Sequence, residues 1–278
     1  MKRFFTLAFL AIALPAVFAQ TSFQDGQLTY TVTSGTNVEV SSVNDKDASG
    51  NVISTITVPA TVSYQNTEYA VTRIGERAFQ YRKMAKVILP NSIVSIGTQA
   101  FSSTDNMTGI ELPSSLKTID NFGFSYTNLT EIDIPASVES IGNSAFASCR
   151  KLAKVTMHDG LKTIGSSVFY HNALSEVTVP STVSELGDKA FLECDQLVKA
   201  TISEGVTRFG DGVFALCKNL KTVNFPSTLT EIGLECFMGC KTLTAVTIGP
   251  SLETIGQSAF GNSGIVTFNI DPANKNFV

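Results

Sequence analysis

The chain has 278 residues, of which 43% are hydrophobic and 16% are charged, and its formal net charge is −4. This is enough apolar material for one continuous core. The slightly acidic balance excludes the broad positive field that nucleic-acid-binding proteins use and argues against general attraction to anionic membranes.

The first residues have the pattern of a secretory signal peptide. Lys2 and Arg3 precede an apolar run over residues 4–14, and the small-residue site Val17-Phe18-Ala19 stands before Gln20. This three-part order predicts a signal peptide over residues 1–19. The run is too short for a spanning helix, and no later apolar stretch is long enough to cross a bilayer. We therefore expect a protein that is secreted or displayed at the cell surface, with no transmembrane segment after signal removal.

Residues 20–73 do not repeat and alternate apolar with polar side chains. Leu28 to Thr33 alternates, breaks at Ser34-Gly35 and resumes at Val38, which is typical of a β-hairpin. Residues 56–59 resemble the strand of an incomplete first coil. The segment is predicted to be an N-terminal β cap, because a solenoid needs its open core end covered.

From residue 74 onward one motif, Ile-Gly-x-x-Ala-Phe, recurs in nine recognisable copies. Its phenylalanines lie 22 or 23 residues apart, which predicts a solenoid with one stacked column of rings. In each coil a strand such as residues 129–135 ends at proline, and the glycine that follows the next isoleucine is expected to take positive φ. The Ala-Phe pair is expected to form a short helical turn. The column is Phe79, Phe101, Phe124, Phe146, Phe169, Phe191, Phe214, Phe237 and Phe260.

Residues 129–149 show the full pattern Leu-x-x-Ile-x-Ile-Pro, then Ser-Val-x-x-Ile-Gly-x-x-Ala-Phe-x-x-Cys. This resembles the leucine-rich repeat of the BspA-like surface-protein family. The resemblance implies a β-dominated α/β leucine-rich-repeat solenoid, a right-handed curved superhelix with a parallel concave sheet and short helical turns. It also implies an exported protein, since some members are adhesins for host or bacterial proteins. The solenoid is expected over residues 74–278, and the chain stops just after a strand with no C-terminal cap.

Cysteine and histidine are the residues that could carry chemistry. Four of the five cysteines, Cys149, Cys194, Cys217 and Cys240, occupy one repeat position, and Cys236 stands at an alanine position. The favoured interpretation is small buried core residues, although Cys194–Cys217 or Cys217–Cys240 disulfides would fit the coil spacing. Zinc would need further ligands beside Cys236 and Cys240. His158 and His171 lack a nucleophile and an orienting carboxylate, and no HExxH, GxSxG or P-loop motif is present. No catalytic, cofactor or metal residue is therefore predicted.

The outward side of the strands remains as the candidate binding face. Its two outward positions per coil bring Glu111, Glu131 and Asp133 into one acidic patch, followed by mixed charges and a neutral Thr/Asn strip. Curved solenoids bind partners along such a face, so we expect a non-enzymatic protein-binding protein with a protein ligand, for example an adhesin. The alternative is a structural spacer within a longer surface protein. The candidate contact residues are Lys86, Glu111, Glu131, Asp133, Lys154, Glu176, Lys199 and Asn224.

Overall fold

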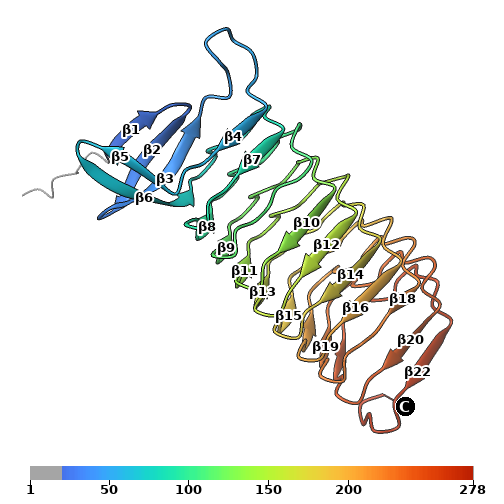
Figure 1. The fold of residues 1–278 in the computed structure, drawn as a ribbon. Coiled ribbons are helices and arrows are strands. Elements are labelled where there is room, and N and C mark those ends of the chain that lie inside the picture. The colour runs from blue at the N-terminus through green and yellow to red at the C-terminus, as the bar shows by residue number, and fades with distance from the viewer. Residues whose placement is uncertain (1–20, 278) are drawn as a thin grey trace, which may run out of the picture.

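The computed structural model describes residues 21–277, which form a β-solenoid of stacked coils (Figure 1). The predicted signal peptide lies outside the described residues. Twenty-two strands and no helix occur in this part of the chain. Most repeats place one strand of up to four residues on one side and one two-residue strand on another. We call the side formed by the longer strands and the segments equivalent to them the long-strand face.

The N-terminal strands close one end of the stack. β1, β2 and β3 pair antiparallel, β3 pairs in parallel with β6, and β5 and β6 form a hairpin through left-handed Gln65 and Asn66. β4 pairs in parallel with β7 and so joins the long-strand face. The bounds are β1 (Ser22–Asp25), β2 (Leu28–Ser34), β3 (Asn37–Val43), β4 (Thr55–Thr57), β5 (Thr61–Tyr64), β6 (Thr67–Ile74) and β7 (Lys86–Ile88).

The short strands continue the sheet that the N-terminal strands begin. Each pairs in parallel with its neighbour, so a thirteen-stranded sheet runs from β1 through β6 to the last coil. They are β8 (Ser95–Ile96), β9 (Thr118–Ile119), β11 (Ser140–Ile141), β13 (Thr163–Ile164), β15 (Glu185–Leu186), β17 (Arg208–Phe209), β19 (Glu231–Ile232) and β21 (Thr254–Ile255).

The longer strands are parallel but form four separate sheets: β4–β7, β10–β12, β14–β16–β18 and β20–β22. The segment 107–113 was expected to be a strand carrying Glu111, and this expectation is wrong, since no strand forms there. Gly109 accounts for the difference, because a glycine has no side chain to pack and therefore weakens a strand. The remaining bounds are β10 (Glu131–Ile134), β12 (Lys154–Met157), β14 (Glu176–Val179), β16 (Lys199–Ile202), β18 (Thr222–Val223), β20 (Ala245–Ile248) and β22 (Thr267–Ile270).

The predicted phenylalanine column is confirmed. All eight consecutive ring pairs from Phe79 to Phe260 stack, with centroids 4.9–5.7 Å apart and interplanar angles of 4–21°. The first eight rings are fully buried, whereas Phe260, which has a stacking partner on one side only, is partly exposed. The column therefore links every repeat to the next through offset aromatic packing.

Two expectations about the turn are wrong. The Ala-Phe pair lies in hydrogen-bonded turns rather than a helix, and the motif glycine does not take positive φ. Glycine is needed there because a Cβ on Gly142 would lie 2.7 Å from the backbone nitrogen of Asn121 in the preceding coil. Positive φ falls instead on two other positions per coil, such as Ser144 and Ser148. Both of these donate their N–H to carbonyls of the next coil, which builds a ladder along the turns.

Candidate functional site

The structure places all eight candidate residues on the long-strand face, and all are exposed. Strand pairing sets Glu131 beside Lys154 and Glu176 beside Lys199 in direct register. Alternation along each strand produces this arrangement, because the residues between them, such as Ile132, point into the core. The sequence pattern thus located the outward positions, although Glu111 reaches the face from an irregular segment.

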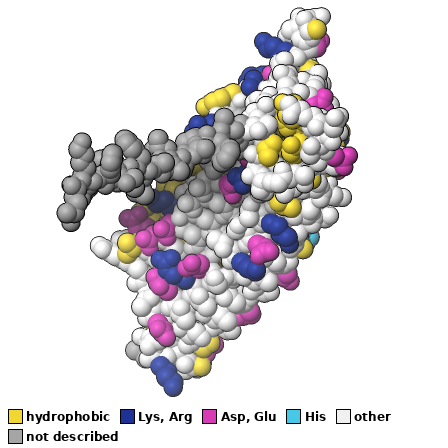
Figure 2. Space-filling view, turned by 90° about the vertical axis from the view of Figure 1, so that its left-hand side faces the viewer, with side chains coloured by type: hydrophobic (Ala, Val, Ile, Leu, Met, Phe, Trp, Pro, Cys, Tyr) yellow, Lys and Arg dark blue, Asp and Glu magenta, His cyan; other side chains and the backbone are white. Residues whose placement is uncertain are grey.

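Several charged side chains elsewhere on the solenoid are paired between coils. Arg73 contacts Glu39 and Asp120, Glu139 contacts Lys117 and Lys162, and Arg208 contacts Glu185 and Glu231, at 2.8–3.9 Å. Figure 2 shows basic and acidic side chains lying next to one another on one side of the molecule. Such exposed pairs each contribute little stability.

Most charged side chains of the long-strand face are unpaired. Within residues 21–277 six of its charged side chains form neither an ion pair nor a side-chain hydrogen bond, although two opposite pairs are in register. Their charges are therefore free to meet a partner. The six are Lys86, Glu111, Glu131, Lys154, Glu176 and Lys199.

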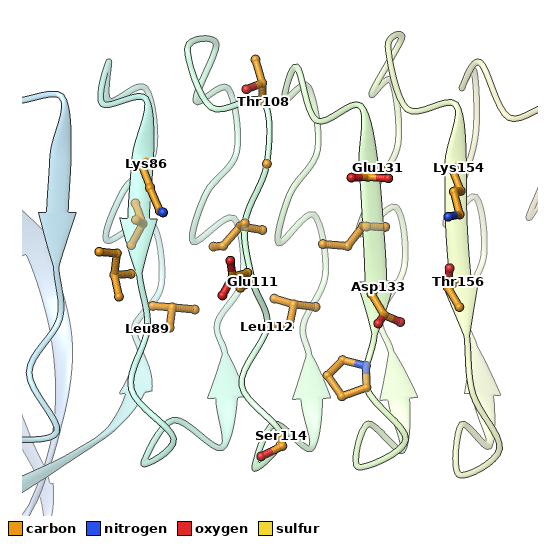
Figure 3. A pocket seen from close by; sticks show the side chains of 16 residues that line it. Lys86, Leu89, Thr108, Glu111, Leu112, Ser114, Glu131, Asp133, Lys154 and Thr156 are labelled. Atoms are coloured by element: carbon orange, nitrogen blue, oxygen red, sulfur yellow. The ribbon is translucent and has the colours of Figure 1, made fainter.

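A groove of about 900 Å³ crosses this face between β7 and β12. In Figure 3 the segment that carries Thr108, Glu111 and Leu112 runs between the strands that carry Lys86 and Glu131. The groove brings five of the eight candidates together: Lys86, Glu111, Glu131, Asp133 and Lys154. Lys199 and Asn224 line a separate hollow of about 510 Å³, and Glu176 lines neither.

Two side chains on this face already have partners. The Asn224 amide accepts from the Ile202 N–H at 2.7 Å and donates to the Ile202 carbonyl at 2.6 Å, so it clamps the preceding coil. His158, which replaces the strand-ending proline, places its Nε2 2.8 Å from Oδ1 of Asp133. Asn224 thus has a structural contact, and Asp133 is the one acidic groove residue that is already engaged.

Sequence reasoning missed the floor of the groove. Ile88, at an outward position, is 43% exposed, and Leu89, Ile110 and Leu112 are partly exposed at inward positions that are buried in the next coil. A signal was available, because Gly109 is the one glycine in the outward column that holds Lys86 and Glu131. Recognising it as an opening required knowing that the adjacent segment forms no strand.

All five cysteines are free and fully buried. The four repeat-position thiols each donate to a phenylalanine carbonyl of the preceding coil at 3.1 Å. Burial raises the pKa of Cys149 to about 11 and that of Cys194 and Cys240 to about 12. The pKa of Cys217 and Cys236 is also raised by burial. Protonated, inaccessible thiols of this kind are inert, so the cysteine column is structural.

No other cluster in residues 21–277 suggests a reactive centre. His171 lies at a left-handed turn position, with its Nδ1 3.1 Å from Oε2 of Glu193. No group of three or more His, Cys, Asp or Glu side chains in this range is arranged to hold a metal ion. Within the same residues there is no helix with the length and apolar character needed to cross a membrane. The groove is thus the principal candidate site.

A stack of near-identical coils with one grooved strand face defines a leucine-rich-repeat solenoid. The sequence model of the BspA type leucine rich repeat region matches residues 72–197 and 162–277, with six copies. The chain belongs to this family. No curated protein sequence matches the chain.

Three solved structures share the fold over most of their length. A leucine rich cell surface protein from Faecalibacterium prausnitzii is 19% identical, with 91% of this chain and 95% of that chain covered and a TM-score of 0.51. The pneumococcal vaccine antigen PcpA is 18% identical over 92% and 88%, with a TM-score of 0.51. The T. pallidum leucine rich repeat protein TpLRR is 24% identical over 80% and 91%, with a TM-score of 0.57. At these identities the likeness concerns the fold.

Proposed function

We propose that this protein is an exported, non-enzymatic adhesin that binds other proteins through its long-strand face at the cell surface. The observation that carries the proposal is a set of unpaired charges gathered around one groove. Lys86, Glu111, Glu131 and Lys154 form no ion pair and line the groove together, whereas Arg73, Glu139 and Arg208 on other sides contact opposite charges in other coils. Complementary charges across an interface steer association and select partners, which is a role that free surface charges can fill.

Export and surface display are supported by two independent observations. The signal-peptide pattern over residues 1–19 provides the route, and the family to which the chain belongs provides the class of protein. The similar protein from Faecalibacterium prausnitzii is itself a cell surface protein. A repeated scaffold with a long polar face suits multipoint contact with a protein rather than enclosure of a small molecule.

The test is a binding screen of residues 20–278 against extracellular matrix proteins and bacterial surfaces at two salt concentrations. We expect saturable binding that weakens with salt and falls at least tenfold when Glu111, Glu131 and Asp133 are changed to lysine. The matched control changes Glu68, Glu235 and Glu253 to lysine, three exposed carboxylates outside the long-strand face. Equal loss in both triple variants would reduce the effect to net charge and contradict the proposal.

A structural spacer is the alternative function, and the uninterrupted sheet supports it. Thirteen strands pair from one end of the described chain to the other, which makes a continuous hydrogen-bonded rod. Two results together would favour this alternative. No protein or surface in the screen would bind, and domains attached to the rod would be displayed at the surface only when the rod is present.

A further inference from the structure

We infer that the groove at Gly109 binds protein segments in which an apolar side chain is flanked by cationic ones. This inference rests on the proposed function and names the kind of partner surface that the groove fits.

The groove exists because the coil that contains Gly109 lacks a side chain at that position and lacks the backbone hydrogen bonds that pair strands in other coils. Within the described residues the backbone of residues 109–112 forms no hydrogen bond, and the last contact toward β10 is the Thr130 N–H to the Thr108 carbonyl at 3.1 Å. A Cβ added to Gly109 would meet no atom within 4 Å, and its φ is not in the left-handed region. Neither packing nor backbone conformation therefore requires glycine at this position.

The floor of the groove is apolar. Ile88 and the partly exposed Leu89, Ile110 and Leu112 all line it. At the equivalent inward positions of the next coil, Ile132 and Ile134 are at most 3% exposed, so the exposed floor does not continue into that coil. A concave apolar surface gains free energy when a partner's apolar side chain displaces water from it.

The rim selects the charge of the partner. Three carboxylates, Glu111, Glu131 and Asp133, line the groove against two lysines, Lys86 and Lys154, and only Asp133 has a side-chain partner, the ring of His158. In Figure 3 Glu111 lies over the middle of the groove, with Glu131 and Asp133 on the adjacent strand. Cationic side chains next to the apolar anchor would meet these carboxylates, and the excess of one carboxylate over the lysines favours them over anionic side chains.

The test uses three synthetic peptides of equal length with the central sequences Arg-Leu-Arg, Glu-Leu-Glu and Arg-Ser-Arg. Binding of each to residues 20–278 is measured by fluorescence polarisation at low salt. We expect the Arg-Leu-Arg peptide to bind at least tenfold more tightly than the other two. Equal affinity of Arg-Leu-Arg and Arg-Ser-Arg would remove the apolar floor from the explanation and overturn the inference.

Two variants locate the binding. Gly109→Leu fills the groove from its floor, and the double change Glu111→Gln with Glu131→Gln removes charge at nearly constant volume. Each is expected to raise the Kd of the Arg-Leu-Arg peptide at least tenfold. Ala245→Leu, at the equivalent exposed position of another coil, is expected to leave it unchanged. Unchanged Kd in Gly109→Leu would overturn the inference.

The two proposals fail in distinguishable ways. If a protein found in the screen binds Gly109→Leu as tightly as the native chain but loses binding in the triple lysine variant, the long-strand face remains the binding site and the groove inference is wrong. If the Arg-Leu-Arg peptide binds at the groove while every protein and surface in the screen fails to bind, the groove inference is supported and the adhesin proposal is contradicted.

Discussion

At the scale of single residues, six of the nine residues three positions after a column phenylalanine donate a side-chain hydrogen bond to a phenylalanine carbonyl of the preceding coil. Cys194 donates to the Phe169 carbonyl at 3.1 Å, Asn172 donates to the Phe146 carbonyl at 3.1 Å, and Thr104 donates to the Phe79 carbonyl at 3.4 Å. Thiol, amide and hydroxyl groups can replace one another there because each supplies a small buried donor to the equivalent carbonyl of the preceding coil.

The buried thiols should make stability fall in alkali. The pKa of Cys194 rises from an ordinary 9.0 to about 12, so above pH 9 only the unfolded chain ionises this thiol. The contribution of the protonated thiol to the free energy of unfolding is complete below pH 9 and is lost as pH rises toward 12. The loss is on the order of 2 kcal/mol per thiol at pH 10.5. We expect Cys194→Thr to flatten part of this decline in urea unfolding between pH 8 and 10.5. An identical decline in native and variant chains would contradict the assignment.

Substitution by alanine should change stability in opposite directions at two glycines, Gly187 and Gly109. A Cβ at Gly187 would lie 2.5 Å from the backbone carbonyl carbon of Gly165, whereas one at Gly109 would meet nothing within 4 Å. Gly187→Ala should lower the free energy of unfolding by about 1–3 kcal/mol or more through overpacking. Gly109→Ala should be neutral or gain up to about 1 kcal/mol, because the unfolded chain loses freedom. Denaturant unfolding of both variants checks this, and equal destabilisation would contradict it.

At the scale of elements, the sequence was informative where a property repeats and uninformative where it depends on neighbours. The column from Phe79 to Phe260 and the outward placement of Glu131 followed from spacing alone. The role of the motif glycine did not, because the clash at Gly142 comes from the backbone of Asn121 in the preceding coil. The groove at Gly109 was also out of reach, since a missing ladder is a relation between three adjacent coils.

Truncating a central ring should divide the stack. Phe169 is fully buried and stacks on Phe146 at 5.7 Å and on Phe191 at 5.4 Å. Phe169→Ala should therefore destabilise the protein by about 3–5 kcal/mol and separate unfolding into two transitions. Phe260→Ala, at a partly exposed ring with one stacking partner, is the control and should cost less. A single unshifted melting transition for Phe169→Ala would count against coupling through the column.

At the scale of the whole molecule, contacts are nearest-neighbour, so local stability should vary along the solenoid axis. The first coils are covered by β1–β6, whose Tyr30, Val38 and Val71 are at most 1% exposed. At the other end β22 pairs on one side only, and its Phe268 and Ile270 are 48% and 37% exposed. A coil with one interface has about half the neighbour stabilisation of a central coil and should open first.

Native-state hydrogen exchange measures this gradient directly. In the chain over residues 20–278 we expect the amides of β20 and β22 to exchange fastest, those of β14 and β16 slowest, and the N-terminal strands to fall between them. Exchange in β22 should also be insensitive to low denaturant, because local opening exposes little surface. Equal protection in every coil would instead require one global unfolding event, and would mean that the column of rings couples the repeats more strongly than a nearest-neighbour stack allows.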